Sequence, residues 1–98
     1  MPDIIRENHV SHGAYRADVE GTGQKAELTW VARGNTRIAN HTYVPNEARG
    51  KGIAGKLVDA MIADARSEGF KIVPQCSYVE AAFRRHPEWT DVLADTAS

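Results

Sequence analysis

The segment from residue 49 to residue 56 combines small and basic residues in a way that suits anion binding. It reads Arg49-Gly50-Lys51-Gly52-Ile53-Ala54-Gly55-Lys56 and lies where a strand is expected to end and a helix to begin. Small residues let a ligand approach the backbone, and the first turn of a helix offers unpaired N–H groups and a positive dipole end. The segment therefore predicts a site for an anion such as a diphosphate. The alternative is a glycine-containing loop whose basic side chains are solvated.

Short alternating stretches before this segment predict a sheet. Apolar and polar residues alternate in three stretches, and turns that contain glycine separate them. Short connections of this kind favour an antiparallel meander. The three strands are expected at residues 15–19, 26–32 and 37–44.

The apolar period changes after residue 52. Apolar residues now recur every three or four positions, which predicts an amphipathic helix over 53–68. A short apolar strand at 70–73 and a second helix from Tyr78 to Arg85 follow. Residues 37–73 have the length of a parallel crossover, so the second strand of this unit is expected to run parallel to the first.

This arrangement defines the fold class and the position of the anion site. We expect one domain over residues 1–98 with an α/β fold of the α+β type. A three-strand antiparallel meander is followed by a helix, a parallel strand and a short helix. The crossover would bring residues 45–52 and 75–78 together at the carboxyl ends of two neighbouring strands, where open sheets bind ligands.

The spacing Arg49-x-x-Gly52-x-Ala54 separates this loop from other phosphate-binding motifs. A Walker A sequence is absent, and Gly55 gives the wrong last interval for a dinucleotide fingerprint. The spacing resembles the pyrophosphate motif Gln/Arg-x-x-Gly-x-Gly/Ala of the GNAT superfamily of N-acetyltransferases. The segments 41–45, 73–76 and 85–89 also resemble a single-domain branch of that superfamily whose members are as short as this chain.

The resemblance implies an enzyme that transfers an acetyl group from acetyl-CoA to an amine, such as a protein lysine or a small amine. Its pantetheine arm is expected between the third and fourth strands, with contacts from Tyr43, Val44, the loop 49–56 and Cys76. Larger members have a first strand and two helices for which no counterpart is expected before the meander. We therefore expect an acceptor side that is open or completed by another subunit. The alternative is a module that binds or senses acyl-CoA without catalysis.

Three side chains are candidates for the reacting groups under this hypothesis. His41 is the best-placed general base, although it is equally well explained as a strand histidine bound to a neighbour. Cys76 is expected beside the thioester, either as a nucleophile or as a residue that lines the pocket. Tyr78 is a candidate acid toward the departing thiolate, and aromatic packing is the alternative. Backbone N–H groups near Tyr43 and Val44 are candidate donors to the carbonyl oxygen.

Composition narrows the possible partners and the location. The formal net charge is -1, and no basic-aromatic surface pattern is present, which disfavours nucleic acid as a partner. One cysteine excludes an internal disulfide, and His9, His12 and His86 show no paired spacing, so no metal site is expected. No signal peptide or membrane-spanning run is apparent. We expect a cytoplasmic monomer or weak homodimer.

Overall fold

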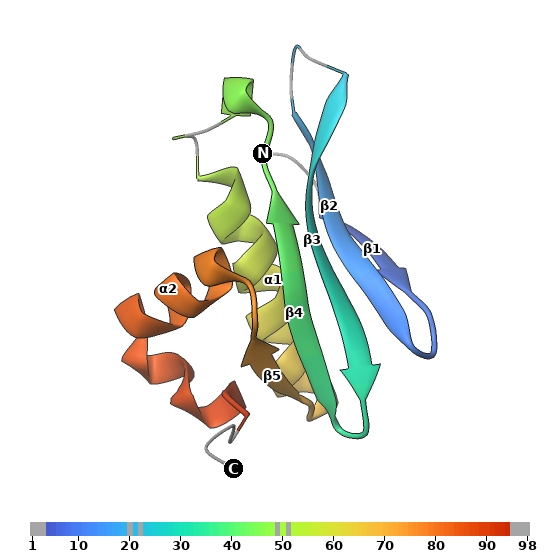
Figure 1. Cartoon of the computed structure of the whole chain (residues 1–98), viewed down its shortest axis with the longest axis vertical. Helices are drawn as coiled ribbons and strands as arrows, with labels where there is room; N and C mark the ends of the chain where they lie inside the picture. Colours follow the sequence, from blue (N-terminus) through green and yellow to red (C-terminus); the bar gives the residue numbers. More distant parts are fainter. Residues whose placement is uncertain (1–3, 20, 22, 49, 51, 95–98) are drawn as a thin grey trace.

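The computed structural model describes residues 4–19, 21, 23–48, 50 and 52–94. Figure 1 shows a sheet in front of a long helix, with a second helix beside the sheet. Short 3-10 helices occur at Asn46–Ala48 (η1) and Pro87–Val92 (η2). The strands and α-helices are β1 (Ile5–Asn8), β2 (His12–Val19), β3 (Gln24–Arg33), β4 (Thr36–Tyr43), α1 (Ile53–Glu68), β5 (Lys71–Pro74) and α2 (Ser77–Arg85).

The predicted meander and crossover are confirmed. The sheet has the order β1-β2-β3-β4-β5. Strands β2, β3 and β4 are antiparallel neighbours, and α1 connects β4 to the parallel strand β5. The element bounds differ from the expected ranges by a few residues, because hydropathy patterns locate the ends of elements poorly.

Strand β1 was not predicted, and it corrects our expectation that no strand precedes the meander. It pairs antiparallel with β2 across the short turn at residues 9–11, and no helix lies between the two strands. Most side chains of β1 are exposed, so the strand carries no apolar alternation that sequence analysis could detect.

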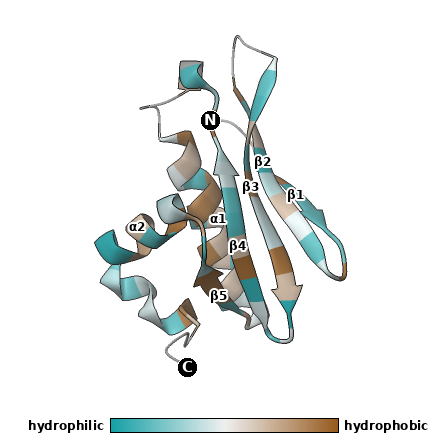
Figure 2. Ribbon diagram, in the orientation of Figure 1, coloured by the Kyte–Doolittle hydropathy of each residue, from teal (hydrophilic) through white to brown (hydrophobic). Residues whose placement is uncertain are grey.

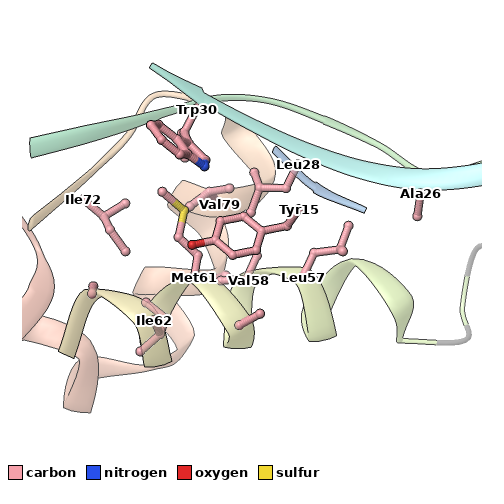
Figure 3. Packing of buried hydrophobic residues seen from close by; sticks show 14 of the residues in the cluster. Tyr15, Ala26, Leu28, Trp30, Leu57, Val58, Met61, Ile62, Ile72 and Val79 are labelled. Atoms are coloured by element: carbon pink, nitrogen blue, oxygen red, sulfur yellow. The ribbon is translucent and has the colours of Figure 1, made fainter. Parts of the chain in front are cut away.

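The core lies between α1 and one face of the sheet. Tyr15, Leu28 and Trp30 point from the sheet toward the buried face of α1 (Figure 3). The buried residues of α1 recur with helical spacing and are Ile53, Leu57, Val58, Ala60, Met61, Ile62 and Ala65. The opposite face of β1–β4 carries no helix among the described elements (Figure 1). The C-terminal turn of α2 is hydrophilic (Figure 2).

A polar network ties β1 and β2 to α1 at the edge of this core. The buried Tyr15 hydroxyl donates a hydrogen bond of 2.9 Å to Asp64, and Arg6 binds the same carboxylate through two nitrogens. Burial raises the pKa of Tyr15, and the bond to Asp64 raises it further. The phenol therefore stays protonated and acts as a permanent donor.

None of the helices in the described part of the chain is long and apolar enough to cross a bilayer.

Candidate functional site

The pairing between strands β4 and β5 ends halfway along β4. Their parallel pairing ends where Ala39 meets Pro74, and the backbone N–H of Cys76 donates a hydrogen bond of 2.9 Å to the carbonyl of Ala39. The chain then turns into α2, while β4 continues through residues 40–43. In the described structure no strand lies beside that part of β4 on the β5 side. The sheet therefore opens at the end of β4 that leads toward α1.

The loop that follows β4 leads into α1 and contains two glycines with left-handed backbone conformations. Gly50 has φ 83° and Gly52 has φ 76°, values that favour glycine over residues with a Cβ atom. Gly52 is the N-cap of α1, no side chain of the described residues is seen to cap the helix, and its first turn contains no acidic residue. The first N–H groups of α1 are therefore available to an anion.

A cavity of about 480 Å³ lies where this helix terminus meets the open part of the sheet. Its size falls in the range of about 300–1,000 Å³ that is usual for small-molecule sites. The cavity combines backbone of the loop, the start of α1 and side chains of β4 and α2. Its lining residues are Thr42, Val44, Ala48, Gly50, Gly52, Ile53, Ala54 and Tyr78.

Part of the predicted cofactor-binding set borders this cavity. Val44, Gly50, Gly52, Ile53 and Ala54 line it. Gly55 and Lys56 follow in the first turn of α1. Arg49 and Lys51 lie outside the described residues. The predicted role of the loop as an anion site stays a prediction for which the described geometry is suitable.

Tyr78 lies across the cavity from the start of α1. A Cβ atom placed on Gly55 would lie 3.8 Å from the Tyr78 hydroxyl, so that hydroxyl is directed at the first turn of the helix. The side chain is 36% exposed rather than buried in the core. Tyr78 lines the cavity, and its role as an acid stays a prediction.

The thiol of Cys76 lies against Thr42 at the N-terminal end of α2. Its Sγ is 3.3 Å from Oγ1 of Thr42. Burial raises the pKa of the thiol, but hydrogen bonds from the Thr42 hydroxyl and from backbone N–H groups at the start of α2 outweigh it. The net result is a pKa below the usual value for cysteine, as is common for thiols at helix N-termini. Hydrogen-bond donors therefore produce this lowered pKa.

His41 and Tyr43 occupy the other face of the sheet. Thr42 pairs with the buried Leu28 and shares the face that α1 covers, whereas His41 pairs with Thr29 and is exposed. Tyr43 is 46% exposed, and its hydroxyl lies 3.4 Å from Oε1 of Gln24. Neither side chain lines the cavity. The structure therefore brings Thr42, Tyr78 and Cys76 together on one side and leaves His41 on the open side.

Thr42 is a site residue that sequence reasoning missed. It lines the cavity and also contacts the thiol of Cys76, which lies 34 positions later in the chain. A threonine in a strand carries no motif, and only the pairing of β4 with its neighbours reveals its position.

Comparison with known proteins agrees with this geometry. The profile of the family described as GCN5-related N-acetyl-transferase matches residues 14–92, which include the loop, α1 and α2. The chain belongs to this family. The NMR solution structure of a GCN5-like candidate N-acetyltransferase from Staphylococcus aureus is also similar, with a TM-score of 0.67 and 25% sequence identity. That match covers 96% of this chain and 91% of the Staphylococcus aureus protein. The resemblance inferred from the loop is thereby confirmed.

Proposed function

We propose that this member of the GCN5-related family is an acetyl-CoA-dependent N-acetyltransferase. The observation that carries the proposal is the uncapped N-terminus of α1, which opens into the cavity beside the open part of the sheet. This arrangement offers an anion site next to a cavity that continues along the end of β4. A nucleotide diphosphate joined to a long thioester arm has the matching shape and charge.

The pyrophosphate is expected at the loop and the first turn of α1. Backbone N–H groups there point along the helix axis toward the cavity and provide charge-assisted donors to phosphate oxygens. Lys56 lies in the same turn, and Arg49 and Lys51 belong to the same loop in the sequence. Glycine at position 52 keeps the backbone accessible, because its two chain neighbours aside, no atom of the described residues lies within 4 Å of the position that a Cβ would take.

The pantetheine arm is expected along the part of β4 that β5 leaves unpaired. Thr42 and Val44 line the cavity there, and the exposed strand edge offers peptide groups to the amides of the arm. This path ends near the thiol of Cys76 and the start of α2. The thioester carbonyl would then lie close to the backbone N–H groups around residues 42–44, which are candidate donors to its oxygen.

The proposed reaction replaces a C–S bond by a C–N bond. The amine nitrogen attacks the thioester carbonyl carbon and loses a proton, and CoA leaves as a thiolate that takes up a proton. We favour direct attack, because a thioester is already activated toward amines. In that route His41, or water held near it, accepts the amine proton from the open face, and Tyr78 donates a proton to the departing thiolate.

An acetyl-Cys76 intermediate is the second route for the same reaction. The lowered pKa of the thiol supports it, since the thiolate is the nucleophilic form. In this route the Cys76 thiolate takes the acetyl group and releases CoA. The amine then attacks the acetyl-cysteine carbonyl and regenerates the thiolate.

The acceptor is expected to approach from the open face of the sheet. No helix covers β1–β4 on that side among the described residues, and β1 leads directly into β2 (Figure 1). An uncovered face accommodates a bulky acceptor, so a protein lysine is possible as well as a small amine. The sheet residues around His41 would then make the acceptor contacts.

Thiol release from acetyl-CoA tests the proposed function. The full-length chain is incubated with acetyl-CoA and a panel of amines and lysine-containing peptides, and free CoA is measured with a thiol reagent. We expect release that depends on an acceptor and exceeds the rate without protein. Tight binding of CoA with no release above that rate for any acceptor would instead identify a sensing module.

Intact mass spectrometry distinguishes the two routes. After brief exposure to acetyl-CoA without an acceptor, direct attack predicts no stable mass increase at Cys76, and Cys76→Ala is expected to keep much of the turnover. His41→Ala should then lose about a hundredfold in rate, the scale of general base catalysis. An acetyl group on Cys76 that an added amine removes at the rate of turnover would establish the covalent route.

A further inference from the structure

The turn between β1 and β2 brings two histidines opposite each other. The backbone N–H of His9 donates a hydrogen bond of 2.8 Å to the carbonyl of His12, so these residues close the hairpin. Glu7 lies on β1 two positions before His9, and the side chains of these two residues are in contact. Cross-strand neighbours have Cβ atoms about 4.5–5.5 Å apart, which is close enough for their side chains to meet one atom.

The side chains of these three residues converge. Oε2 of Glu7 lies 2.8 Å from Nε2 of His9, and the rings of His9 and His12 stack with their centroids 4.6 Å apart. One potential ligand atom from each residue lies within 4.8 Å of the other two. Among the described residues, Glu7, His9 and His12 thus form a group of three side chains that is able to hold one metal ion.

Neighbouring side chains hold the three groups in place. Arg16 binds the other carboxylate oxygen of Glu7, so that Oε2 remains directed at the imidazoles. The hydroxyl of Ser11 lies 3.2 Å from Nδ1 of His12 and restrains that ring. Such outer partners orient metal ligands in known sites. Arg16 also places a positive charge near the site. This charge is partly balanced by Glu27, whose Oε1 accepts a hydrogen bond of 2.9 Å from Nε of Arg16.

We propose that the β1–β2 hairpin binds a divalent transition-metal ion of the Zn²⁺ class. The ligands are one oxygen of Glu7 and one ring nitrogen each of His9 and His12, with water in the remaining position. Two imidazoles and one carboxylate suit Zn²⁺, Ni²⁺ or Cu²⁺, whereas Ca²⁺ and Mg²⁺ require more oxygen ligands. The expectation of no metal site rested on spacing in the sequence, and the hairpin turn supplies the proximity that this spacing did not reveal.

The site is separate from the proposed acetyl transfer. In Figure 1 the β1–β2 turn lies at the lower right, while the loop that enters α1 lies at the upper left. A bound ion would connect Glu7 on β1 with His12 on β2 and so fasten the edge strand to the sheet. The proposal therefore stands independently of the acetyl-CoA site, and metal binding is expected to stabilise the fold.

Competition with a chromogenic chelator measures the binding of Zn²⁺ to the untagged full-length chain. We expect one ion for each chain. His9→Ala and His12→Ala should each weaken binding by at least about tenfold, since changes around metal ligands commonly have effects of about 10–100-fold. Both residues are exposed, so the variants are expected to fold. In thermal melts, Zn²⁺ should raise the melting temperature of the parent chain and of neither variant.

Two control variants test the assignment of the ligands. Glu88→Gln removes a carboxylate that contacts His86 at 2.9 Å with the same spacing of two residues but without a second histidine, so Zn²⁺ affinity should not change. Cys76→Ser removes the thiol and should also leave the affinity unchanged. The proposal is overturned if the parent chain binds no Zn²⁺, if His9→Ala and His12→Ala bind as tightly as the parent, or if Cys76→Ser abolishes binding.

Discussion

The two ends of α1 provide a test of the anion site in which backbone strain is held constant. Gly52 caps the N-terminus with φ 76° and ψ 11°, and Gly69 caps the C-terminus with φ 82° and ψ 19°. At neither glycine would an added Cβ come within 4 Å of a described residue other than its chain neighbours. Gly52→Ala and Gly69→Ala therefore introduce nearly the same left-handed strain at opposite ends of one helix. Only Gly52 lines the cavity.

The expected loss of stability is similar for the two variants. A residue with a Cβ in the left-handed region costs about 1–2 kcal/mol. For a domain of this size, each kcal/mol lowers the melting temperature by about 4–8 °C. We therefore expect both melting temperatures to fall by roughly 4–16 °C, with circular dichroism spectra close to that of the parent chain.

The expected loss of CoA affinity is confined to Gly52→Ala. The added methyl group would stand between the backbone and a phosphate oxygen and would remove at least one charge-assisted hydrogen bond. Such a bond contributes about 1.5–3 kcal/mol, and 1.4 kcal/mol corresponds to a tenfold change in affinity. Calorimetric titration with CoA, at a temperature where both variants are folded, should show about a 10–150-fold loss for Gly52→Ala and little change for Gly69→Ala. Equal affinities in the two variants would refute the placement of the pyrophosphate at this helix terminus.

Three further predictions concern single hydroxyl groups. Tyr15→Phe removes the buried hydrogen bond to Asp64 and should destabilise the fold by about 1 kcal/mol, measured by urea unfolding. Thr42→Val removes a donor that stabilises the Cys76 thiolate, so the pKa of the thiol should rise. The midpoint of the pH profile for alkylation by iodoacetamide should then move to higher pH. Tyr78→Phe should lower the rate of acetyl transfer by about a hundredfold while the dissociation constant of CoA stays within a factor of about three, if the hydroxyl is the acid.

Each of these three predictions has a result that would contradict it, and Tyr43→Phe is the control variant for Tyr15→Phe. Tyr43→Phe removes an exposed phenol hydroxyl and should change stability by less than about 0.5 kcal/mol. A Tyr15→Phe variant as stable as Tyr43→Phe would contradict the importance of the Asp64 bond. An unchanged alkylation midpoint in Thr42→Val would show that the N–H groups of α2 alone set the pKa of Cys76. If Tyr78→Phe transfers the acetyl group as fast as the parent chain, the hydroxyl is not the acid and Tyr78 only packs against its neighbours.

The parts of the fold that rest on apolar periodicity could be predicted from the sequence. The alternation in β2 and β3 and the helical spacing of α1 reflect burial on one face, and burial is what hydropathy records. Strand β1 escaped prediction because most of its side chains are exposed. A strand at the edge of a sheet can form through backbone hydrogen bonds alone, and such bonds do not require alternating apolar residues in the sequence.

The site could be predicted only where local sequence determines it. The glycines and small residues of the loop act through their own backbone, so the position of the cavity beside 50–54 follows from a short segment. The contact between Thr42 and Cys76 depends on pairing over 34 positions, and no local pattern encodes it. The faces of β4 were equally ambiguous, because both sets of alternate residues are mixed in polarity.

A β-bulge in β4 resolves that ambiguity and shapes the site. Trp30 pairs with Ala39 but Thr29 pairs with His41, so Asn40 is an extra residue, and it accepts a hydrogen bond of 2.6 Å from the Thr29 hydroxyl. In a regular strand, residues 39 and 42 would face opposite sides of the sheet. The extra residue places both on the side that α1 covers, which brings Thr42 to Cys76 and sends His41 to the open face. A bulge also bends its strand. The parallel pairing with β5 ends at Ala39, so the sheet opens next to the bulge at Asn40. The bulge therefore decides which residues of β4 face the proposed acetyl-CoA cavity and which face the proposed acceptor.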